Sequence, residues 1–530
     1  MSAKTTPKGL KEVTYNDAVA RSKEYFGGDE LAATVWVSKY ALKDSFGHIY
    51  ESSPEDMHHR IAAEIERIEK NYPNPLSRDE IFALLDHFRY VIPQGGPMTG
   101  IGNNLQIASL SNCFVIGHKK PADSYGGIIR MDEEQVQIMK RRGGVGHDLS
   151  HLRPTGSPVL NSALTSTGIV PFMERYSNST REVAQDGRRG ALMLTISIKH
   201  PDAERFIDAK VDTSKVDDEF MRAAIAGKPY HQQFPIDAEK PMYEQDIDAR
   251  ALWKKIIHNA WKSAEPGVLF WDTILRESVP DCYADEGFNT VSTNPCGEIP
   301  LCPYDSCRLL ALNLYSYVDK PFTAEASFDF AKFRDHVGKA MRMMDDIIDL
   351  ELEKVEQIIA KIDADPEEAD IRYVESNLWK KVREMALKGR RTGLGITAEG
   401  DMIAALGMRY GSDEAVAFAV EVHKTLALAA YGASVEMAEE RGAFPLYDAA
   451  RELDNPMIAR IREADPALYE RMVKSGRRNI AMLTIAPTGT TSLMSQTTSG
   501  IEPVFRPVYK RRRKINPSDH NVKVAFVDDT

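Results

Sequence analysis

The spacing of apolar residues predicts a helical region at the start of the chain. Within residues 54–72, apolar side chains recur at intervals of three and four positions, which places them on one face of a helix. They are Met57, Ile61, Ile65 and Ile68. Residues 77–91 begin with Ser77 as a helix cap, followed by two acidic residues in the first turn. We therefore expect a small all-helical domain over residues 1–91.

From residue 92 onward, short apolar runs alternate with helical patterns. The apolar runs predict strands at 110–116, 192–198, 268–271, 309–314 and 480–485. The helical patterns cover 131–140, 163–173, 201–209, 248–263, 327–359 and 413–441. Such alternation over several hundred residues favours an α/β fold, and we expect residues 92–530 to form one barrel domain.

The composition is that of a globular protein, with 43% hydrophobic and 27% charged residues, and it excludes fibrous and disordered classes. No apolar run reaches the roughly 18–20 residues that span a bilayer, and the first residues lack the apolar core of a signal peptide. The net charge of −11 argues against a nucleic-acid partner. Five cysteines argue against a disulfide framework and favour the reducing cytoplasm. We therefore expect a cytoplasmic protein that contacts neither membrane nor nucleic acid.

Three of the five cysteines, Cys296, Cys302 and Cys307, lie in one segment rich in proline and glycine. Structural zinc sites are normally built from paired short knuckles, so we expect no metal ion bound by these thiols. Asn294, Cys296 and Glu298 occupy alternate positions. On an extended segment their side chains point to one side, which predicts a thiol flanked by an amide and a carboxylate.

Two further motifs combine glycine with polar residues. APTGTTSLMS (486–495) follows an apolar run and presents backbone N–H groups and hydroxyls, which suits either an anion site or a plain helix cap. The Walker A pattern is absent from it. In RRGGVGHDLSHLRPTGSPV (141–159), the glycines permit either a tight turn or a close approach of the backbone to a ligand.

Taken in order, these segments resemble the large catalytic subunit of ribonucleotide reductase, in its adenosylcobalamin-dependent form (class II). The matching motifs are SNCFV (111–115), RRGGVGHDLSHLRPTGSPV (141–159), NPCGEIPL (294–301), YDSCRL (304–309), RRTGLGI (390–396), APTGTTS (486–492) and SGIEPVF (499–505). The resemblance implies a ten-stranded α/β barrel made of two antiparallel five-stranded halves. A finger loop through its centre would carry the radical cysteine.

The resemblance also implies the chemistry, in which a ribonucleoside di- or triphosphate loses its 2′-OH by a thiyl-radical reaction. Cys296 matches the cysteine that removes the 3′ hydrogen atom. Glu298 matches the base that takes the 3′-OH proton, and Asn294 matches the amide that bonds the substrate hydroxyls. Cys113 and Cys307 match the pair that is oxidised to a disulfide as it supplies two electrons.

Nucleotide-binding residues follow from the same resemblance. The substrate phosphates would be held by Pro487, Thr488, Gly489, Thr490 and Thr491. Contacts around the ribose would come from Ser111, Asn112 and Gly144. An effector deoxynucleoside triphosphate would be bound by Asp123, Arg153, Arg188 and Arg189. The last two arginines have a plain alternative as solvated loop charges.

Adenosylcobalamin is the expected radical source, and its cobalt the only metal. The expected partners are a thioredoxin-like reductant and a second copy of the chain in a homodimer. The short C-terminus predicts an incomplete barrel that a second chain could complete, and the short N-terminus leaves no room for the ATP-cone of the family. Two alternatives remain open. One is a class I catalytic subunit with a separate metal-containing radical subunit, and the other is a nucleotide-binding half of a split reductase.

Overall fold

The computed structural model describes residues 10–117, 123–185, 188–209, 213–506, 508, 511–514 and 526–529. For 184–185, 188–189, 511–514 and 526–529 it describes the backbone alone. The chain mixes helices and strands, and about half of it is helical. None of the helices in the described ranges combines the length and the apolar character needed to cross a membrane.

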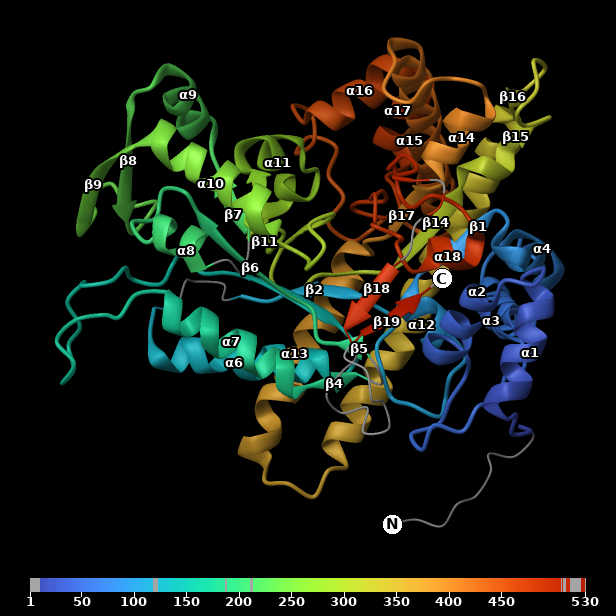
Figure 1. Cartoon of the computed structure of the whole chain (residues 1–530), viewed down its shortest axis with the longest axis horizontal. Coiled ribbons are helices and arrows are strands. Elements are labelled where there is room, and N and C mark those ends of the chain that lie inside the picture. The colour runs from blue at the N-terminus through green and yellow to red at the C-terminus, as the bar shows by residue number, and fades with distance from the viewer. Residues whose placement is uncertain are drawn as a thin grey trace.

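Two sheets form the centre of the molecule (Figure 1). The larger sheet has the order β10 (Gly267–Phe270), β7 (Thr213–Val216), β6 (Leu192–Ser197), β3 (Gly144–Asp148), β2 (Cys113–Val115) and β13 (Ser306–Cys307). Its neighbouring strands are parallel except β13, which runs antiparallel to β2. The smaller sheet has the order β1 (Val91–Pro93), β14 (Leu309–Asn313) and β17 (Gly393–Thr397). Only Arg308 separates β13 from β14, so one stretch of chain joins the two sheets.

The other strands of the described residues form separate two-stranded sheets. They are β4 (Ala184–Gln185) with β5 (Arg188–Arg189), β8 (Pro229–Phe234) with β9 (Tyr243–Asp248), β11 (Ser292–Thr293) with β12 (Pro300–Leu301), β15 (Val318–Asp319) with β16 (Ser327–Phe328), and β18 (Arg511–Lys514) with β19 (Phe526–Asp529). The pair β11–β12 is the one that matters for the site, because the loop between its strands contains Cys296.

Long helices pack around the sheets. They are α6 (Tyr125–Met139), α7 (Val170–Glu182), α10 (Ala249–Ser263), α12 (Phe330–Asp363), α13 (Ala369–Gly389) and α15 (Asp413–Arg441). Shorter helices are α5 (Gly95–Gly100), α8 (Ala203–Ala209), α9 (Asp218–Ala226), α11 (Trp271–Glu277), η2 (Pro280–Glu286), η3 (Leu314–Tyr317), α14 (Glu399–Ala405), α16 (Pro456–Ala464), α17 (Pro466–Ser475) and α18 (Thr491–Ser495). Figure 1 shows α6, α7 and α13 together on one side of the larger sheet.

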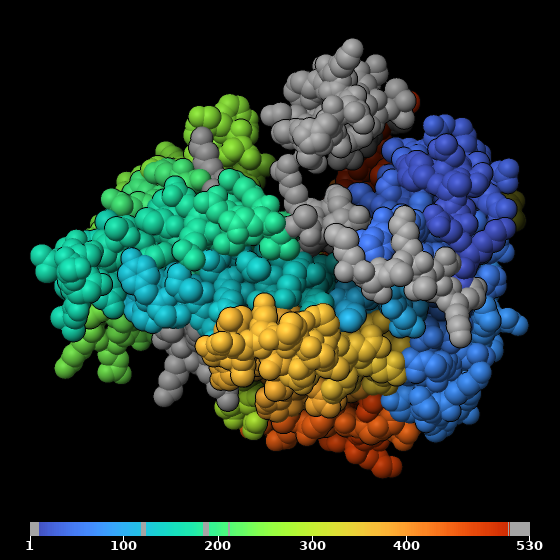
Figure 2. Space-filling model, turned by 90° about the horizontal axis from the view of Figure 1, so that it is seen from below, coloured from blue at the N-terminus to red at the C-terminus, as the bar shows by residue number. Residues whose placement is uncertain are grey.

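The N-terminal region is helical, as expected. It contains α1 (Tyr15–Tyr25), α2 (Glu30–Lys39), α3 (Pro54–Glu69), α4 (Arg78–Leu85) and η1 (Asp86–Phe88). Figure 2 shows these helices, in blue, on one side of the molecule and α6 and α7, in cyan and teal, on the other. Trp36 and Ile65 belong to the same buried cluster as Leu312 of β14 and Met344 of α12. The N-terminal helices and the sheets therefore share one hydrophobic core, and the domain division at residue 91 stays a prediction.

Several predicted elements need correction. The helix predicted at 163–173 begins only at Val170, because Leu164 and Gly168 have positive φ angles of 61° and 79° that interrupt a helix. The helix predicted over 77–91 ends at Leu85, since His87 and Phe88 also have positive φ. The predicted strand 480–485 is extended and alternately buried, yet it forms only a single bridge, between Leu394 and Leu483.

A buried charge network ties α3, α12 and α15 together. The side chain of Arg441 is fully buried and bonds Asp345, at 3.1 Å, and Asp346, at 2.9 Å, on α12. It also bonds Glu69 at the end of α3, and Glu69 accepts from Arg342 of α12 at 3.0 Å. The N-terminal helices are therefore held to the rest of the fold by charge as well as by apolar packing.

Replacing Arg441 by methionine should destabilise the fold strongly, because it removes the ion pair of buried Asp346 and one cationic partner each from buried Asp345 and Glu69. We expect a loss of about 3–5 kcal/mol in the free energy of unfolding, measured by urea denaturation. The matched control is Arg471→Met, which removes an exposed pair with Glu439 and should cost less than about 1 kcal/mol. Equal losses in the two variants would contradict the assigned role of Arg441.

Candidate functional site

The strands β2 and β13 place Cys113 directly opposite Cys307. Directly opposed residues of antiparallel strands have Cα atoms roughly 4.5–5.5 Å apart, which lies within the range that disulfides span. Asn112 N–H donates to the Cys307 carbonyl at 3.1 Å and fixes the register beside the pair. Two cysteines that are distant in sequence are thus brought within bonding reach by a strand pairing.

Cys296 lies on the loop between β11 and β12, flanked as predicted by an amide and a carboxylate. Asn294 Nδ2 donates to Glu298 Oε2 at 2.5 Å, and Asn294 Oδ1 accepts from the N–H of Ile299 at 3.0 Å. The expected extended geometry is wrong, however. The loop is a turn in which Gly297 N–H donates to the Asn294 carbonyl at 3.0 Å and Gly297 has φ +82°. The turn, rather than strand alternation, brings Asn294 and Glu298 together.

Two glycines of β3 make room for this loop. A Cβ atom on Gly146 would lie 1.9 Å from the carbonyl oxygen of Thr293, and one on Gly144 would lie 2.9 Å from Cγ of Pro295. Real Cβ atoms do not tolerate such contacts, so only glycine lets the loop lie directly on the strand. Gly144 lies beneath Pro295, the residue that precedes Cys296, and its expected place beside the ribose stays a prediction.

A cavity of about 310 Å³ gathers the residues of separate motifs. Its walls include Cys296 and Glu298 from the loop and Asn112 and Cys113 from the start of β2. The segment 487–491, which the sequence analysis assigns to phosphate binding, forms another wall. In that segment Pro487 and Gly489 are exposed, while Thr488 and Thr491 are buried. The cavity therefore joins a thiol, a carboxylate and a turn suited to anions.

Ser111 lies behind this cavity. It is buried, and its hydroxyl donates to Glu351 of α12 at 3.0 Å and to Ser306 at 3.4 Å. Cys307 is also fully buried, next to Gly393 of β17. Neither Ser111 nor Cys307 lines the cavity. Ser111 lies just before β2, and Cys307 lies on β13.

Burial shapes the acidity of the site. It raises the pKa of the Glu298 carboxyl above its ordinary value, and the hydrogen bond from Asn294 lowers it part of the way back. Burial also raises the pKa of the Cys307 thiol well above its usual range, and the nearby Glu298 adds to the effect. Cys307 is therefore a neutral thiol at physiological pH. Cys296, by contrast, is exposed.

Two cationic residues of the cavity were missed by the sequence analysis. Lys39 comes from the end of α2, and Arg142 immediately precedes the glycine pair before β3. Arg142 lies inside a motif that the sequence analysis did single out, so its position could have been noticed. The sequence around Lys39 contains no motif that indicates a binding role, because only the fold brings the N-terminal helices to this wall of the cavity.

The expected effector residues lie in a different place. Arg153 Nε bonds Asp123 Oδ2 at 2.7 Å, and Arg153 also donates to the Pro158 carbonyl at 2.8 Å. Asp123 lines a second cavity of about 920 Å³. The side chains of Arg188 and Arg189 lie outside the described residues. The structure thus brings two of the four expected effector residues together.

Residues 111–528 match the family model described as ribonucleotide reductase, barrel domain. The chain belongs to the ribonucleotide reductase family. Among the relatives, it is 31% identical to the vitamin B12-dependent ribonucleoside-diphosphate reductase of Mycobacterium tuberculosis (strain CDC 1551 / Oshkosh), over 91% of this chain and 62% of that protein. The protein of the same name from Thermoplasma acidophilum is 32% identical, over 82% of this chain and 50% of the relative.

A further member of the reductase family, the ribonucleoside-diphosphate reductase large chain of Neurospora crassa, is 25% identical over 76% of this chain and 45% of the relative. The chain therefore spans about half to three fifths of the length of these relatives. The expectation of a mixed α/β fold with a reductase barrel domain is confirmed. The ten-stranded count and the finger loop stay predictions.

The pKa of Glu298 can be tested directly. We expect its carboxyl to titrate above 4.5, the ordinary value for glutamate, because burial disfavours the charged form. In Asn294→Ala the pKa should rise further, since a hydrogen bond to the charged form is lost. Infrared difference spectra across a pH titration would report the carboxyl band, with Glu298→Gln as the subtraction control. A pKa that stays at 4.5 or falls in Asn294→Ala would contradict this account.

Proposed function

We propose that the chain replaces the ribose 2′-OH of a ribonucleotide with hydrogen by radical chemistry at Cys296. The observation that carries the proposal is the single cavity that joins Cys296, Glu298 and Cys113 to the turn 487–491. A thiol, a carboxylate, a second thiol and an anion site are the groups that this reaction needs. The reductase family supports the same assignment.

In this proposal Cys296, as a thiyl radical, removes the hydrogen atom from C3′. Glu298 accepts the 3′-OH proton, a task for which its raised pKa suits it because it is a stronger base than an ordinary glutamate. Asn294 holds the Glu298 carboxylate in place through its 2.5 Å hydrogen bond. The 2′-OH leaves as water.

The two electrons come from the thiols of Cys113 and Cys307, which lose two hydrogens and form a disulfide. The balance is one ribonucleotide plus two thiols, giving one deoxyribonucleotide, one disulfide and one water. The opposed positions of the two cysteines on β2 and β13 support this pairing. The neutral state of the Cys307 thiol supports it too, because a thiol rather than a thiolate delivers a hydrogen atom.

We propose adenosylcobalamin as the radical source, because the relatives at 31–32% identity are named vitamin B12-dependent. When bound, the cofactor would supply the radical that takes the hydrogen atom from the Cys296 thiol. The exposure of Cys296 fits this role, since a bulky cofactor can reach it from outside while Cys113, Cys302 and Cys307 are buried. A class I subunit served by a separate radical protein is the less favoured alternative.

We propose ribonucleoside diphosphates as substrates, again following the names of the relatives, with triphosphates as the alternative. Their phosphates would bind the turn 487–491, with Lys39 and Arg142 adding positive charge at the same cavity. Asn112 and Gly144 would border the ribose, with Ser111 behind Asn112. A deoxynucleoside triphosphate would act as effector near Asp123 and Arg153.

We propose further that the two sheets belong to a ten-stranded barrel, with 294–299 as its finger loop. A thioredoxin-like protein would reduce the disulfide, and two copies of the chain would form the dimer. A second chain would complete the barrel if 1–530 is one half of a split reductase. The antiparallel junction of β2 with β13 supports the barrel, because it joins the larger sheet to β14 through Arg308.

The activity is tested with the purified chain, CDP or CTP, adenosylcobalamin and dithiothreitol, with and without deoxynucleoside triphosphates. We expect deoxynucleotide that forms only when the cobalamin is present. Cys296→Ser should bind CDP as well as the unaltered chain does and yet give no product, because an alcohol does not form the required radical under these conditions. Product from Cys296→Ser would overturn the assignment. Activity that appears only after a separate radical-generating protein is added would favour the class I alternative.

Arg142→Ala and Lys39→Ala should each weaken CDP binding about tenfold or more, since a charge-assisted contact to phosphate is lost. Binding of cytidine, which has no phosphate, should change little. Isothermal titration with both ligands measures the difference. Lys388→Ala, which removes an exposed pair with Glu384 outside the cavity, is the matched control. Equal weakening of CDP and cytidine would place these cations away from the phosphates.

A further inference from the structure

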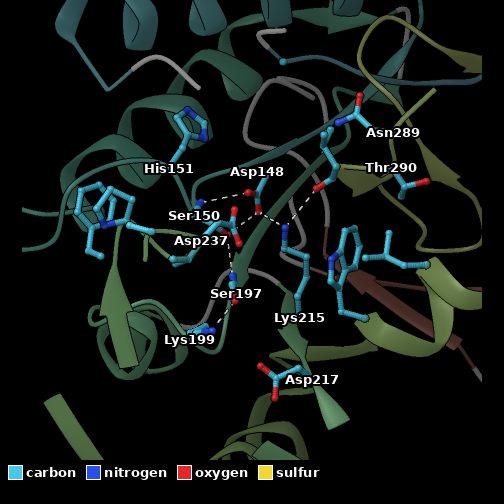
Figure 3. A pocket seen from close by; sticks show the side chains of 18 of the residues that line it. Asp148, Ser150, His151, Ser197, Lys199, Lys215, Asp217, Asp237, Asn289 and Thr290 are labelled. Carbon is cyan, nitrogen blue, oxygen red and sulfur yellow. Dashed lines mark hydrogen bonds and ion pairs between the residues drawn. The ribbon is translucent and has the colours of Figure 1, made fainter. Parts of the chain in front are cut away.

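The chain segment that leads into the Cys296 loop is held by a lysine from the larger sheet. Lys215, on β7, is 5% exposed, and its ammonium lies 2.7 Å from Asp148 Oδ1, at the end of β3. It also donates to the carbonyl oxygen of Val291 at 3.2 Å, just before β11 begins. Lys215 reaches across β6 to make these contacts, because β6 lies between β3 and β7. Figure 3 shows Lys215 and Asp148 pointing toward one another.

A second link runs through hydroxyl groups. Asp148 Oδ1 accepts from Thr195 Oγ1 of β6 at 3.0 Å, and Thr195 Oγ1 lies 3.0 Å from Ser292 Oγ of β11. Ser150 also donates to Asp148 Oδ1, at 2.9 Å. Two successive residues of the loop segment, Val291 and Ser292, are therefore anchored to one carboxylate, the first through Lys215 and the second through Thr195.

The anchored segment has little freedom beyond this point. Thr293 follows at once, and its carbonyl lies over Gly146 with no room for even a methyl group between them. Asn294 then begins the turn that holds Glu298. Any displacement of Val291 and Ser292 is thus passed on to Cys296 within a few residues.

A buried ion pair is a poor means of stabilising a fold, because removing two charges from water costs about as much as their attraction returns. Lys215 and Asp148 also line the cavity of about 920 Å³, so an ammonium without its partner has space to swing away. Trp271, whose ring centroid lies 4.3 Å from the Lys215 ammonium, covers the lysine from another side. The Trp271 ring blocks movement of the Lys215 side chain toward that side, which suits a positioning role.

We propose that Lys215 and Asp148 are a positioning pair that fixes the Cys296 loop on β3. The pair acts through Val291 and Ser292 and touches neither substrate nor cofactor. The inference rests on the proposed function only in that Cys296 is the reacting group. The anchoring itself is a property of the loop and is measurable without turnover.

The test variant is the double change Lys215→Met with Asp148→Asn, which removes both charges together and avoids leaving one buried alone. Hydrogen exchange of the amides in 293–299 should speed up at least about tenfold, because Asn294, Gly297 and Ile299 donate hydrogen bonds within the anchored turn. The value of kcat should fall about tenfold while KM changes less than about threefold, since alignment rather than binding is lost.

The matched control is Arg477→Met with Glu452→Gln, which removes another buried ion pair that lies outside these contacts. It should lower stability, because Arg477 also donates to the carbonyls of Asn479 and Ile480, without changing exchange in 293–299. Ser292→Ala, a milder change that keeps both charges, should accelerate exchange in the same peptide and covers the case in which the double variant fails to fold. Unchanged exchange in both Lys215→Met/Asp148→Asn and Ser292→Ala would overturn the inference. An unaltered chain without reductase activity would instead count against the proposed function, and the exchange result would still decide the anchoring.

Discussion

The direct contact between the Cys296 loop and β3 is the constraint on which the site depends. The carbonyl oxygen of Thr293 occupies the space that a side chain at position 146 would need, so the backbone of the loop packs directly against the backbone of β3. This close contact fixes the distance between β3 and the turn in which Asn294 bonds Glu298. The turn thereby lies at the cavity that Cys113 also lines. The buried links from Lys215 and Thr195 hold the same segment from its other end. Cys296 is thus positioned by backbone contact with β3 and by side chains of β6 and β7.

Local pattern was enough to predict long helices such as α12 and α15 but not α13, and the roles of the motif residues at the site stay predictions. The helix at 413–441 has the expected bounds, because its capping residues and terminal charges act locally. Asn294 and Glu298 meet as expected, although through a turn rather than an extended segment. Lys39 and Lys215 could not be predicted, since each reaches its place only through the packing of distant strands and helices. The extended run 480–485 was misjudged because alternate burial does not require a regular ladder.

Burial dominates around Glu298 and Cys307, whereas positive charge lies beside the segment 487–491. Burial raises the pKa of the Cys307 thiol, with a contribution from Glu298, and it raises the pKa of the Glu298 carboxyl against the opposing hydrogen bond from Asn294. The anion end of the cavity is different, because Gly489 and the loop around it are open to water and cations lie beside them. Burial therefore sets the acidity of Glu298 and Cys307, while the segment 487–491 forms a partly exposed wall of the cavity with Lys39 and Arg142 beside it.

The position of Lys39 has a consequence for how this protein can be divided. The last residue of α2 lines the same cavity as Cys296, and α2 and α3 share their apolar core with β14 and α12. The N-terminal helices accordingly form one wall of the cavity and share its supporting core. A shortened version that starts at β1 would lose both a side of its binding cavity and the packing that supports the smaller sheet.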